Sequence, residues 1–397
     1  MKICVIGGGA SGMAAALAAA ETPGCRVMLL ERQARLGRKL SATGNGRCNL
    51  SNCGAGRYHG DDPSFCQFAL TQFPPEETLS WFSGLGLVTV TEPGGKVYPY
   101  SDQANSVVDV LRLSLEKPNI VVRTGFEVKD IKKTDTGFAV IGREEKEECD
   151  RVIVACGGLA GTGLGGSLSG YQLLQKCGHR ITKLRPAIVQ LKTDWDGIAA
   201  LKGVRANCHA AIYRDGQLYR ESTGEVQFTD YGLSGPVIME ISRDVCAQPG
   251  NWECRLDFLP EREDLKAFLM KRRNSPVTTD DLLTGILHNR LGRVLTKAAG
   301  IRGGRPLETL TDEDLSAVCR LVKCFSIPIS GPMGMDKAQV TAGGADTTQF
   351  DPETMESRIL PGLYACGEVL DIDGDCGGYN LQWAWSSGRL AGKCGSR

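Results

Sequence analysis

The sequence lacks the cysteine and histidine patterns that mark metal sites. Its 16 cysteines form no C-x-x-C pair and it has only 4 histidines, whereas zinc sites usually combine two close cysteine pairs, or one pair with nearby histidines. Several cysteines, such as Cys4, Cys156 and Cys366, lie in apolar runs where a reduced thiol behaves as a small hydrophobe. We therefore expect no metal, and mostly reduced thiols, which predict a cytoplasmic location.

Long apolar runs and net charge are also missing. No stretch reaches the roughly 18 apolar residues of a transmembrane helix, so no membrane partner is expected. The 46 basic residues are balanced by 46 acidic ones, while a dedicated nucleic-acid-binding protein normally has a basic excess. We therefore expect no nucleic-acid partner, although neutrality leaves room for a local basic patch.

Glycine, by contrast, is abundant: the chain has 50, about twice the usual 7%. The first cluster, residues 7–12, fits G-x-G-x-x-G between an apolar run (2–6) and a helical pattern (11–20), and a second apolar run (26–30) ends at Glu31. In such a unit the first glycine permits the turn, the second admits a pyrophosphate and the third lets helix and strand pack. The acid accepts hydrogen bonds from ribose hydroxyls. The pattern predicts a dinucleotide site that disfavours a 2′-phosphate.

A second glycine cluster, late in the chain, indicates which dinucleotide is bound. Residues 362–368 resemble a strand ending in Gly367-Glu368. In many FAD enzymes a motif of this kind contacts the ribityl chain and the pyrophosphate. A dehydrogenase that binds NAD at the first turn would have no use for this motif. Residues 377–382 then open a helix whose backbone N–H groups can stabilise negative charge at flavin N1/O2. Together these motifs predict FAD.

Two further glycine-rich loops lie between these motifs. The loop at 37–49 combines cations with glycines, which suits a cradle for phosphate and ribityl groups. Residues 161–166 again fit G-x-G-x-x-G after an apolar run (151–155), but no second strand ending in an acid follows about 20 residues later. We interpret this segment as a loop near the flavin, so that NADH or NADPH, if used, docks transiently.

With these motifs in place, the chain resembles the aminoacetone-oxidase-like family of FAD-binding flavoproteins, which includes the 3-dehydro-bile-acid Δ4,6-reductases. The most specific part is E-R-x(4)-G-R-K-L-x-x-T-G-N-G-R-C-N at 31–49, followed by G-E-V-L-D-I-D-G-D-C-G-G-Y-N-L-Q-W-A at 367–384. Residues 228–236 and 341–344 also match, so the resemblance spans essentially the whole chain. It implies bound FAD, a two-part insertion that covers the face of the flavin, and a substrate pocket between the domains.

The predicted cofactor-binding residues come from these motifs and from the strand ends beside them. They are Gly7, Gly9, Ser11, Gly12, Glu31, Arg32, Arg38, Lys39, Gly44, Asn45, Arg47, Cys48, Val128, Ala155, Gly157, Gly367, Glu368, Gly378, Tyr379, Asn380 and Leu381.

The catalytic residues are harder to predict, because hydride transfer to or from a flavin depends on positioning more than on a nucleophile. Tyr379, Asp230, Arg47 and Cys48 are the candidates, and each also has a structural or cofactor-binding interpretation. Many members of the resembled family have histidine where this chain has Asp230, so a mechanism that uses that imidazole does not transfer to it.

The predicted fold class is α/β: a Rossmann-like FAD-binding domain interrupted by an inserted β-rich domain and a small helical domain. Residues 1–185 and 333–397 form the FAD-binding domain. Residues 186–260, with 326–332, show alternating strand patterns and form the β-rich substrate domain, and 261–325 form the helical domain.

The predicted function is that of an FAD-dependent oxidoreductase acting on a small organic substrate. It either reduces a conjugated C=C, as in a steroid or bile-acid-like enone, or oxidises an amine or ketone, with NAD(P)H or O₂ as transient partner. The alternatives are a flavoprotein that serves tRNA modification, which neutral charge disfavours, and a non-catalytic FAD-binding protein.

Overall fold

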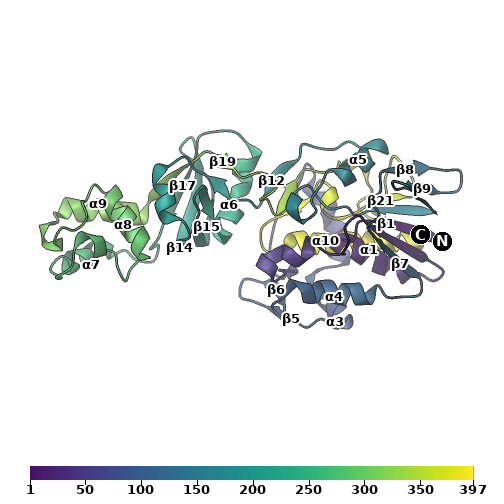
Figure 1. The fold of residues 1–397 in the computed structure, drawn as a ribbon, viewed down its shortest axis with the longest axis horizontal. Coiled ribbons are helices and arrows are strands. Elements are labelled where there is room, and N and C mark those ends of the chain that lie inside the picture. Colours follow the sequence, from purple (N-terminus) through teal and green to yellow (C-terminus); the bar gives the residue numbers. More distant parts are fainter. Residues whose placement is uncertain (397) are drawn as a thin grey trace. The chain divides into compact units, whose positions relative to one another are not determined.

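The computed structural model describes residues 1–396 and consists of two compact units. Unit 1 comprises Met1–Arg185 together with the segment from Ala338 onward, and unit 2 comprises Pro186–Lys337. Unit 1 is therefore built from two segments far apart in sequence. Figure 1 shows this directly, since the purple N-terminal and yellow C-terminal elements lie together in unit 1.

The core of unit 1 is a parallel sheet with strand order β21-β11-β1-β2-β7. Central strand β1 is almost fully buried, as expected for a continuous apolar run in a parallel sheet. The strands are β1 (Lys2–Ile6), β2 (Arg26–Glu31), β7 (Ile120–Thr124), β11 (Arg151–Val154) and β21 (Leu363–Ala365).

Helix α1 (Ala10–Ala20) packs closely against α10 (Tyr379–Gly392). Glycines of α10 allow this contact: a β-carbon on Gly388 would lie 2.4 Å from the carbonyl oxygen of Ser11, and one on Gly392 would lie 2.4 Å from that of Ala15. The first and the last parts of unit 1 are therefore joined backbone to backbone.

Smaller elements complete unit 1. Its other helices are α2 (Gln67–Gln72), α3 (Pro75–Gly84), α4 (Ala104–Ser114) and α5 (Ser169–Lys176). Its other strands are β3 (Ser51–Asn52), β4 (Tyr58–His59), β5 (Thr89–Thr91), β6 (Lys96–Pro99), β8 (Asp130–Lys133), β9 (Phe138–Ile141), β10 (Lys146–Cys149), β20 (Val340–Ala342) and β22 (Asp373–Gly374), with short 3-10 helices η1 (Leu40–Gly46) and η3 (Thr162–Leu164) in the loops.

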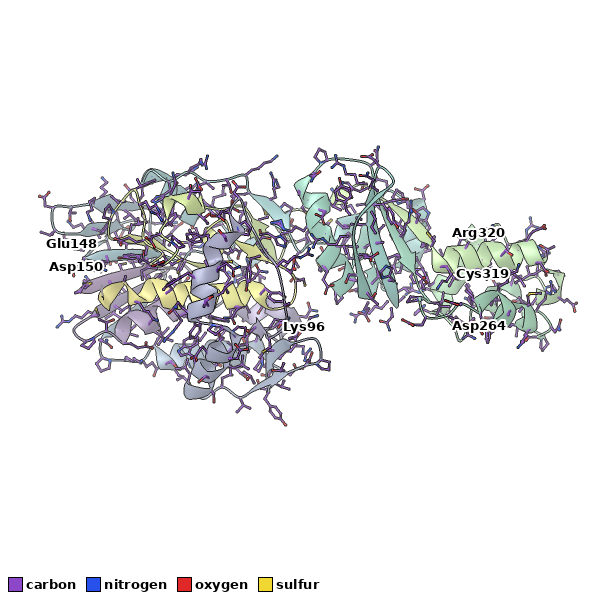
Figure 2. The ribbon with its side chains drawn as sticks, turned by 180° about the vertical axis from the view of Figure 1, so that it is seen from behind. Lys96, Glu148, Asp150, Asp264, Cys319 and Arg320 are labelled. Atoms are coloured by element: carbon purple, nitrogen blue, oxygen red, sulfur yellow. The ribbon has the colours of Figure 1, made fainter. Side chains whose placement is uncertain are left out.

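Unit 2 contains an antiparallel sheet with strand order β18-β17-β14-β15-β16-β13-β19 and a group of helices. The strands are β13 (Leu191–Lys192), β14 (Arg205–Arg214), β15 (Gln217–Phe228), β16 (Gly232–Ser234), β17 (Trp252–Asp257), β18 (Phe325–Ile329) and β19 (Gly331–Pro332); β12 (Arg185–Ala187) spans the boundary. The helices are α6 (Pro236–Ala247), α7 (Leu265–Arg272), α8 (Asn289–Ala298) and α9 (Asp312–Lys323). Figure 2 labels Asp264, which precedes α7, and Cys319 and Arg320 on α9.

The predicted α/β fold class is confirmed, with differences in detail. Helix α6 lies inside the segment predicted to be β-rich; its buried Val237, Ile238 and Ile241 follow a helical spacing behind Pro236 at the first turn. The β and helical parts of unit 2 share one hydrophobic core, and the second segment of unit 1 begins at Ala338, not at 333.

Across residues 1–396, no helix has the length and apolar character needed to cross a membrane.

Candidate functional site

The glycine turn between β1 and α1 has two kinds of glycine. A β-carbon on Gly7 would lie 2.4 Å from the carbonyl oxygen of Ala155, and one on Gly12 would lie 1.8 Å from that of Gly7, so both positions are closed by backbone. At Gly9, the N-cap of α1, no atom lies within 4 Å of the same point. The turn therefore keeps an open approach to the helix N-terminus, where an anion is favoured.

Glu31, the last residue of β2, is held beside this turn. Its Oε2 accepts a hydrogen bond of 2.7 Å from the backbone N–H of Gly8, and its Oε1 accepts one of 2.7 Å from that of Gln33. A carboxylate has about four acceptor positions, so two remain for ribose hydroxyls. The predicted ribose acceptor is thus fixed in position by the backbone around it.

Two of the predicted site residues, Lys39 and Glu368, connect the loop at 37–49 with the Gly367-Glu368 motif. The ammonium group of Lys39 lies 2.8 Å from Oε2 of Glu368, and the backbone N–H of Thr341 donates to Oε1 of Glu368. Gly44 and Asn45, in the same loop as Lys39, have left-handed backbones with φ of 57° and 56°. The structure therefore brings the 37–49 loop and the C-terminal motif to one place.

Arg47 and Cys48 lie in this loop but are occupied in other ways. The Arg47 guanidinium forms ion pairs with Glu92 and Asp102 and lies 4.1 Å over the Tyr98 ring. Burial raises the pKa of Cys48 to about 12, so its thiol stays protonated near neutral pH. These contacts favour a structural interpretation of both side chains.

The second G-x-G-x-x-G segment lies against the end of β2. Arg32 donates to the carbonyl oxygen of Gly165, and Arg38 donates to that of Gly163 at 3.0 Å. Arg38 also donates to Oε1 of Gln33 at 2.9 Å. These two arginines therefore hold a loop beside the first turn.

The N-terminus of α10 has no side-chain cap and no acidic residue in its first turn. Its N-cap, Gly378, has a φ of 107°, and a β-carbon there would lie 2.4 Å from the carbonyl oxygen of Ser51. The same β-carbon would lie 2.7 Å from Oδ1 of Asn49, a buried atom without a hydrogen-bond partner. Asn380 donates to the carbonyl oxygen of Gly374 and accepts from its N–H, so this amide orients the preceding loop.

Tyr379 is also engaged within the protein. Its hydroxyl donates to the carbonyl oxygen of Ala55 at 3.1 Å, and its ring meets that of Tyr58 edge-on at 6.3 Å. The Tyr58 hydroxyl donates in turn to the carbonyl oxygen of Tyr379. Tyr379 therefore fixes the start of α10 against β4.

The remaining predicted residues of unit 1 lie partly in loops and strand ends and partly in helices α1 and α10. Ala155 and Val128 are buried, whereas Gly157 has a φ of 69° with open space at its β-carbon position. Ser11 is buried in α1 and Leu381 packs against the core. Gly367 donates its N–H to the hydroxyl of Ser387.

Asp230 differs from all other predicted site residues because it belongs to unit 2. It forms an ion pair of 2.6 Å with Lys202, and both side chains are more than half exposed. The hydrogen bond from Lys202 lowers the pKa of Asp230.

Sequence reasoning missed the pair formed by His59 and Asp375. Nε2 of His59 lies 2.8 Å from Oδ1 of Asp375, and the backbone N–H of Arg57 donates to Oδ2 at 3.1 Å. Partial burial would raise the pKa of Asp375, but the hydrogen bonds from His59 and Arg57 lower it to about 2. The pairing of β4 with β22 creates this contact, and no spacing signal in the sequence could have indicated it.

Comparison with known proteins agrees with this geometry. The family described as HI0933-like protein Rossmann domain matches residues 1–394. A 3-dehydro-bile acid delta(4,6)-reductase of Clostridium scindens is 42% identical over 99% of this chain and 98% of its own. A ribosomal RNA dihydrouridine synthase of Escherichia coli is 33% identical over 96% of this chain and 95% of its own.

One solved structure, the 3-ketosteroid delta1-dehydrogenase of Sterolibacterium denitrificans, covers 98% of both chains at 12% identity with a TM-score of 0.47. The family match and the reductase relative both extend over nearly the whole chain and confirm the resemblance inferred from the motifs. The chain belongs to the HI0933-like family.

Proposed function

We propose that the chain is an FAD-dependent oxidoreductase that reduces a C=C bond conjugated with a carbonyl group. The reductase relative at 42% identity supports this reaction class. The single observation that carries the proposal is that an open dinucleotide turn and a histidine–aspartate pair occur in one unit, each beside a helix N-terminus.

The residues of unit 1 fit FAD. The open turn at Gly9 would receive the pyrophosphate, Glu31 the ribose, and the uncapped start of α10 the N1/O2 edge of the flavin. The buried, unpartnered Oδ1 of Asn49 is one further polar group facing the start of α10. When bound, FAD supplies the hydride chemistry that no amino-acid side chain can provide.

Reduction of the conjugated bond adds a hydride at the β-carbon and a proton at the α-carbon. We assign the proton to His59, because the Asp375 carboxylate is anionic and can stabilise an imidazolium. Tyr379 and Arg47 keep positioning functions, since both are engaged with neighbouring groups. The loop at η3 is expected to lie beside the bound cofactor, because Arg32 and Arg38 hold it against the end of β2.

Anaerobic stopped-flow spectroscopy tests the proposal. NADH or NADPH should bleach the flavin absorbance, and a 3-oxo-4,6-diene steroid acid should restore it faster than buffer alone. Bleaching by an amine such as aminoacetone, with reoxidation by O₂ only, would instead identify an oxidase. We further propose NADH or NADPH as the electron donor and a cytoplasmic location; the 16 free cysteines support the second of these.

A second candidate substrate is uridine in RNA. Two relatives, at 33% and 27% identity, are ribosomal RNA dihydrouridine synthases. The C5=C6 bond of uracil is conjugated with the C4 carbonyl, so the same hydride and proton would reduce it. Incubation with ribosomal RNA and NADPH, followed by mass spectrometry of nucleosides, tests this substrate; a gain of two hydrogens on uridine is the expected product.

A further inference from the structure

Residues 282–307 of unit 2, which we call the basic segment, contain no acidic residue. They carry five cations in a chain whose total charge is zero: Arg290, Arg293, Lys297, Arg302 and Arg305. The segment comprises α8 and the loops on both sides of it.

Three of these cations lie on one face of helix α8. Arg290, Arg293 and Lys297 are spaced i, i+3 and i+7 and are exposed, while Leu291 and Leu295 are fully buried. Along a helix this spacing covers about 10 Å. Figure 1 shows α8 grouped with α7 and α9 in unit 2.

The loop after α8 extends this charged face. Arg302 and Arg305 are exposed. Between them, the backbone N–H of Gly304 donates to Oδ2 of Asp280 at 2.9 Å, so this carboxylate holds the loop in place.

The cations of the basic segment are poorly neutralised. Arg293 lies 3.9 Å from Asp281, and Arg305 donates to the carbonyl oxygen of Thr309. Among the described residues, no ion pair is formed by Arg290, Lys297 or Arg302. Elsewhere in the chain, Arg47 and Arg123 each contact two carboxylates. Exposed cations without an ion pair also occur in unit 1, so what distinguishes the basic segment is that its five cations lie within residues 282–307 with no acidic residue among them.

We propose that the basic segment binds the sugar-phosphate backbone of RNA. Four of its five cations are arginines, whose planar fork matches phosphate oxygens. The segment contains no Phe, Tyr or Trp to stack on bases, so binding is to the backbone and depends little on sequence. None of the exposed large apolar side chains lies in the segment, which disfavours a membrane surface.

RNA binding by the basic segment is a property separate from the proposed enone reduction. It rests on the second candidate substrate, uridine in RNA, only in that RNA is taken as the polyanion that binds. RNA binding can be measured without turnover, so its failure and the failure of enone reduction are separate results.

Fluorescence anisotropy of the full chain with a short labelled RNA duplex, over a range of KCl concentrations, tests the inference. The triple variant Arg290→Glu, Arg293→Glu, Lys297→Glu should bind at least about tenfold more weakly. The slope of log K against log salt should become shallower by about 2 to 3, because each phosphate contact contributes about 0.7–0.9. A neutral triple variant with glutamine at these positions should have an RNA affinity between those of the original chain and the glutamate variant. Circular dichroism verifies that each variant is folded.

The matched control reverses the same number of charges in unit 1. Arg26, Lys117 and Lys132 are exposed there and form no ion pair in the described part of the chain; their glutamate variants should bind RNA nearly as tightly as the original chain. An equal loss of RNA affinity in the control and test variants, or an unchanged RNA affinity of the test variant, would overturn the proposal. So would binding to phosphatidylglycerol vesicles that the test variant abolishes while no RNA binding is detected.

Discussion

Glu31 already accepts two backbone hydrogen bonds, and its remaining acceptor positions are expected to bind ribose. Replacing it by alanine should weaken FAD binding by roughly 10- to 100-fold, because a hydrogen bond to a charged group contributes about 1.5–3 kcal/mol. Titration of FAD fluorescence measures the Kd. Glu76→Ala, an exposed acid in α3, is the control, and an unchanged Kd for the Glu31 variant would remove this residue from the ribose site.

Asp375 gives a pH-dependent prediction. Its folded-state pKa is lowered to about 2, so its stabilising contribution is present above an unfolded pKa of about 3.9 and is lost as the pH falls through about 2. Asp375→Asn should lower the free energy of unfolding by about 2 kcal/mol at neutral pH, and by progressively less below pH 4. Urea unfolding of both proteins between neutral pH and pH 2 measures this. A difference in the free energy of unfolding that does not change with pH would mean that the hydrogen bonds to Asp375 do not favour its ionised form.

Single residues could be predicted from the sequence where their role depends on local backbone. Gly7 and Gly12 are needed because backbone closes on them, and that requirement follows from the turn motif alone. Arg47 shows the limit, since Glu92 and Asp102 lie 45 and 55 positions away along the chain. Such partners are set by tertiary packing, which a motif does not encode.

At the scale of elements, the glycines of the β1–α1 turn have different functions: one is needed for packing and another for cofactor binding. Gly9→Ala should leave the free energy of unfolding within about 0.5 kcal/mol, because its φ of −83° suits alanine and the β-carbon meets open space. The added methyl group should still weaken FAD binding, since it fills the approach to the α1 N-terminus. Thermal unfolding and FAD titration measure the two effects.

Gly12→Ala is the matched comparison, because its β-carbon would meet the Gly7 carbonyl oxygen. It should destabilise the protein outright, by an amount typical of overpacking, about 1–3 kcal/mol. Equal stability of the two alanine variants would contradict this division between the glycines.

Elements with a strong periodic pattern were predicted closely and ambiguous ones were not. The apolar run at 2–6 is β1, because a short buried strand in a parallel sheet is apolar throughout. Helix α6 was missed because its surroundings alternate like strands, and its buried face becomes apparent only when it packs on β15.

For the whole molecule, the two-segment composition of unit 1 predicts an unusual digestion pattern. Limited proteolysis near 185–186 and 337–338 should leave the fragments 1–185 and 338–397 eluting together, because α1 and α10 pack through backbone contacts. Size-exclusion chromatography with mass spectrometry identifies the fragments. Separate elution of the two under native conditions would show that this packing does not hold unit 1 together.

Net charge describes the whole chain and carries no information about its individual segments. A total of zero correctly describes the 46 basic and 46 acidic residues, but it conceals a stretch without acids whose cations the fold leaves largely unpaired. Pairing depends on which side chains the fold brings together, so only the structure separates neutralised arginines from available ones.

The close packing of α1 against α10 has a consequence for how the chain is made. During translation, α1 leaves the ribosome before unit 2, whereas its glycine-lined partner α10 follows only after all of unit 2 has been synthesised. Until then the apolar surface of α1 is uncovered, while unit 2, being continuous in sequence, can already fold. The nascent chain therefore exposes its cofactor-binding half longest, and this is the half for which protection by a chaperone matters most.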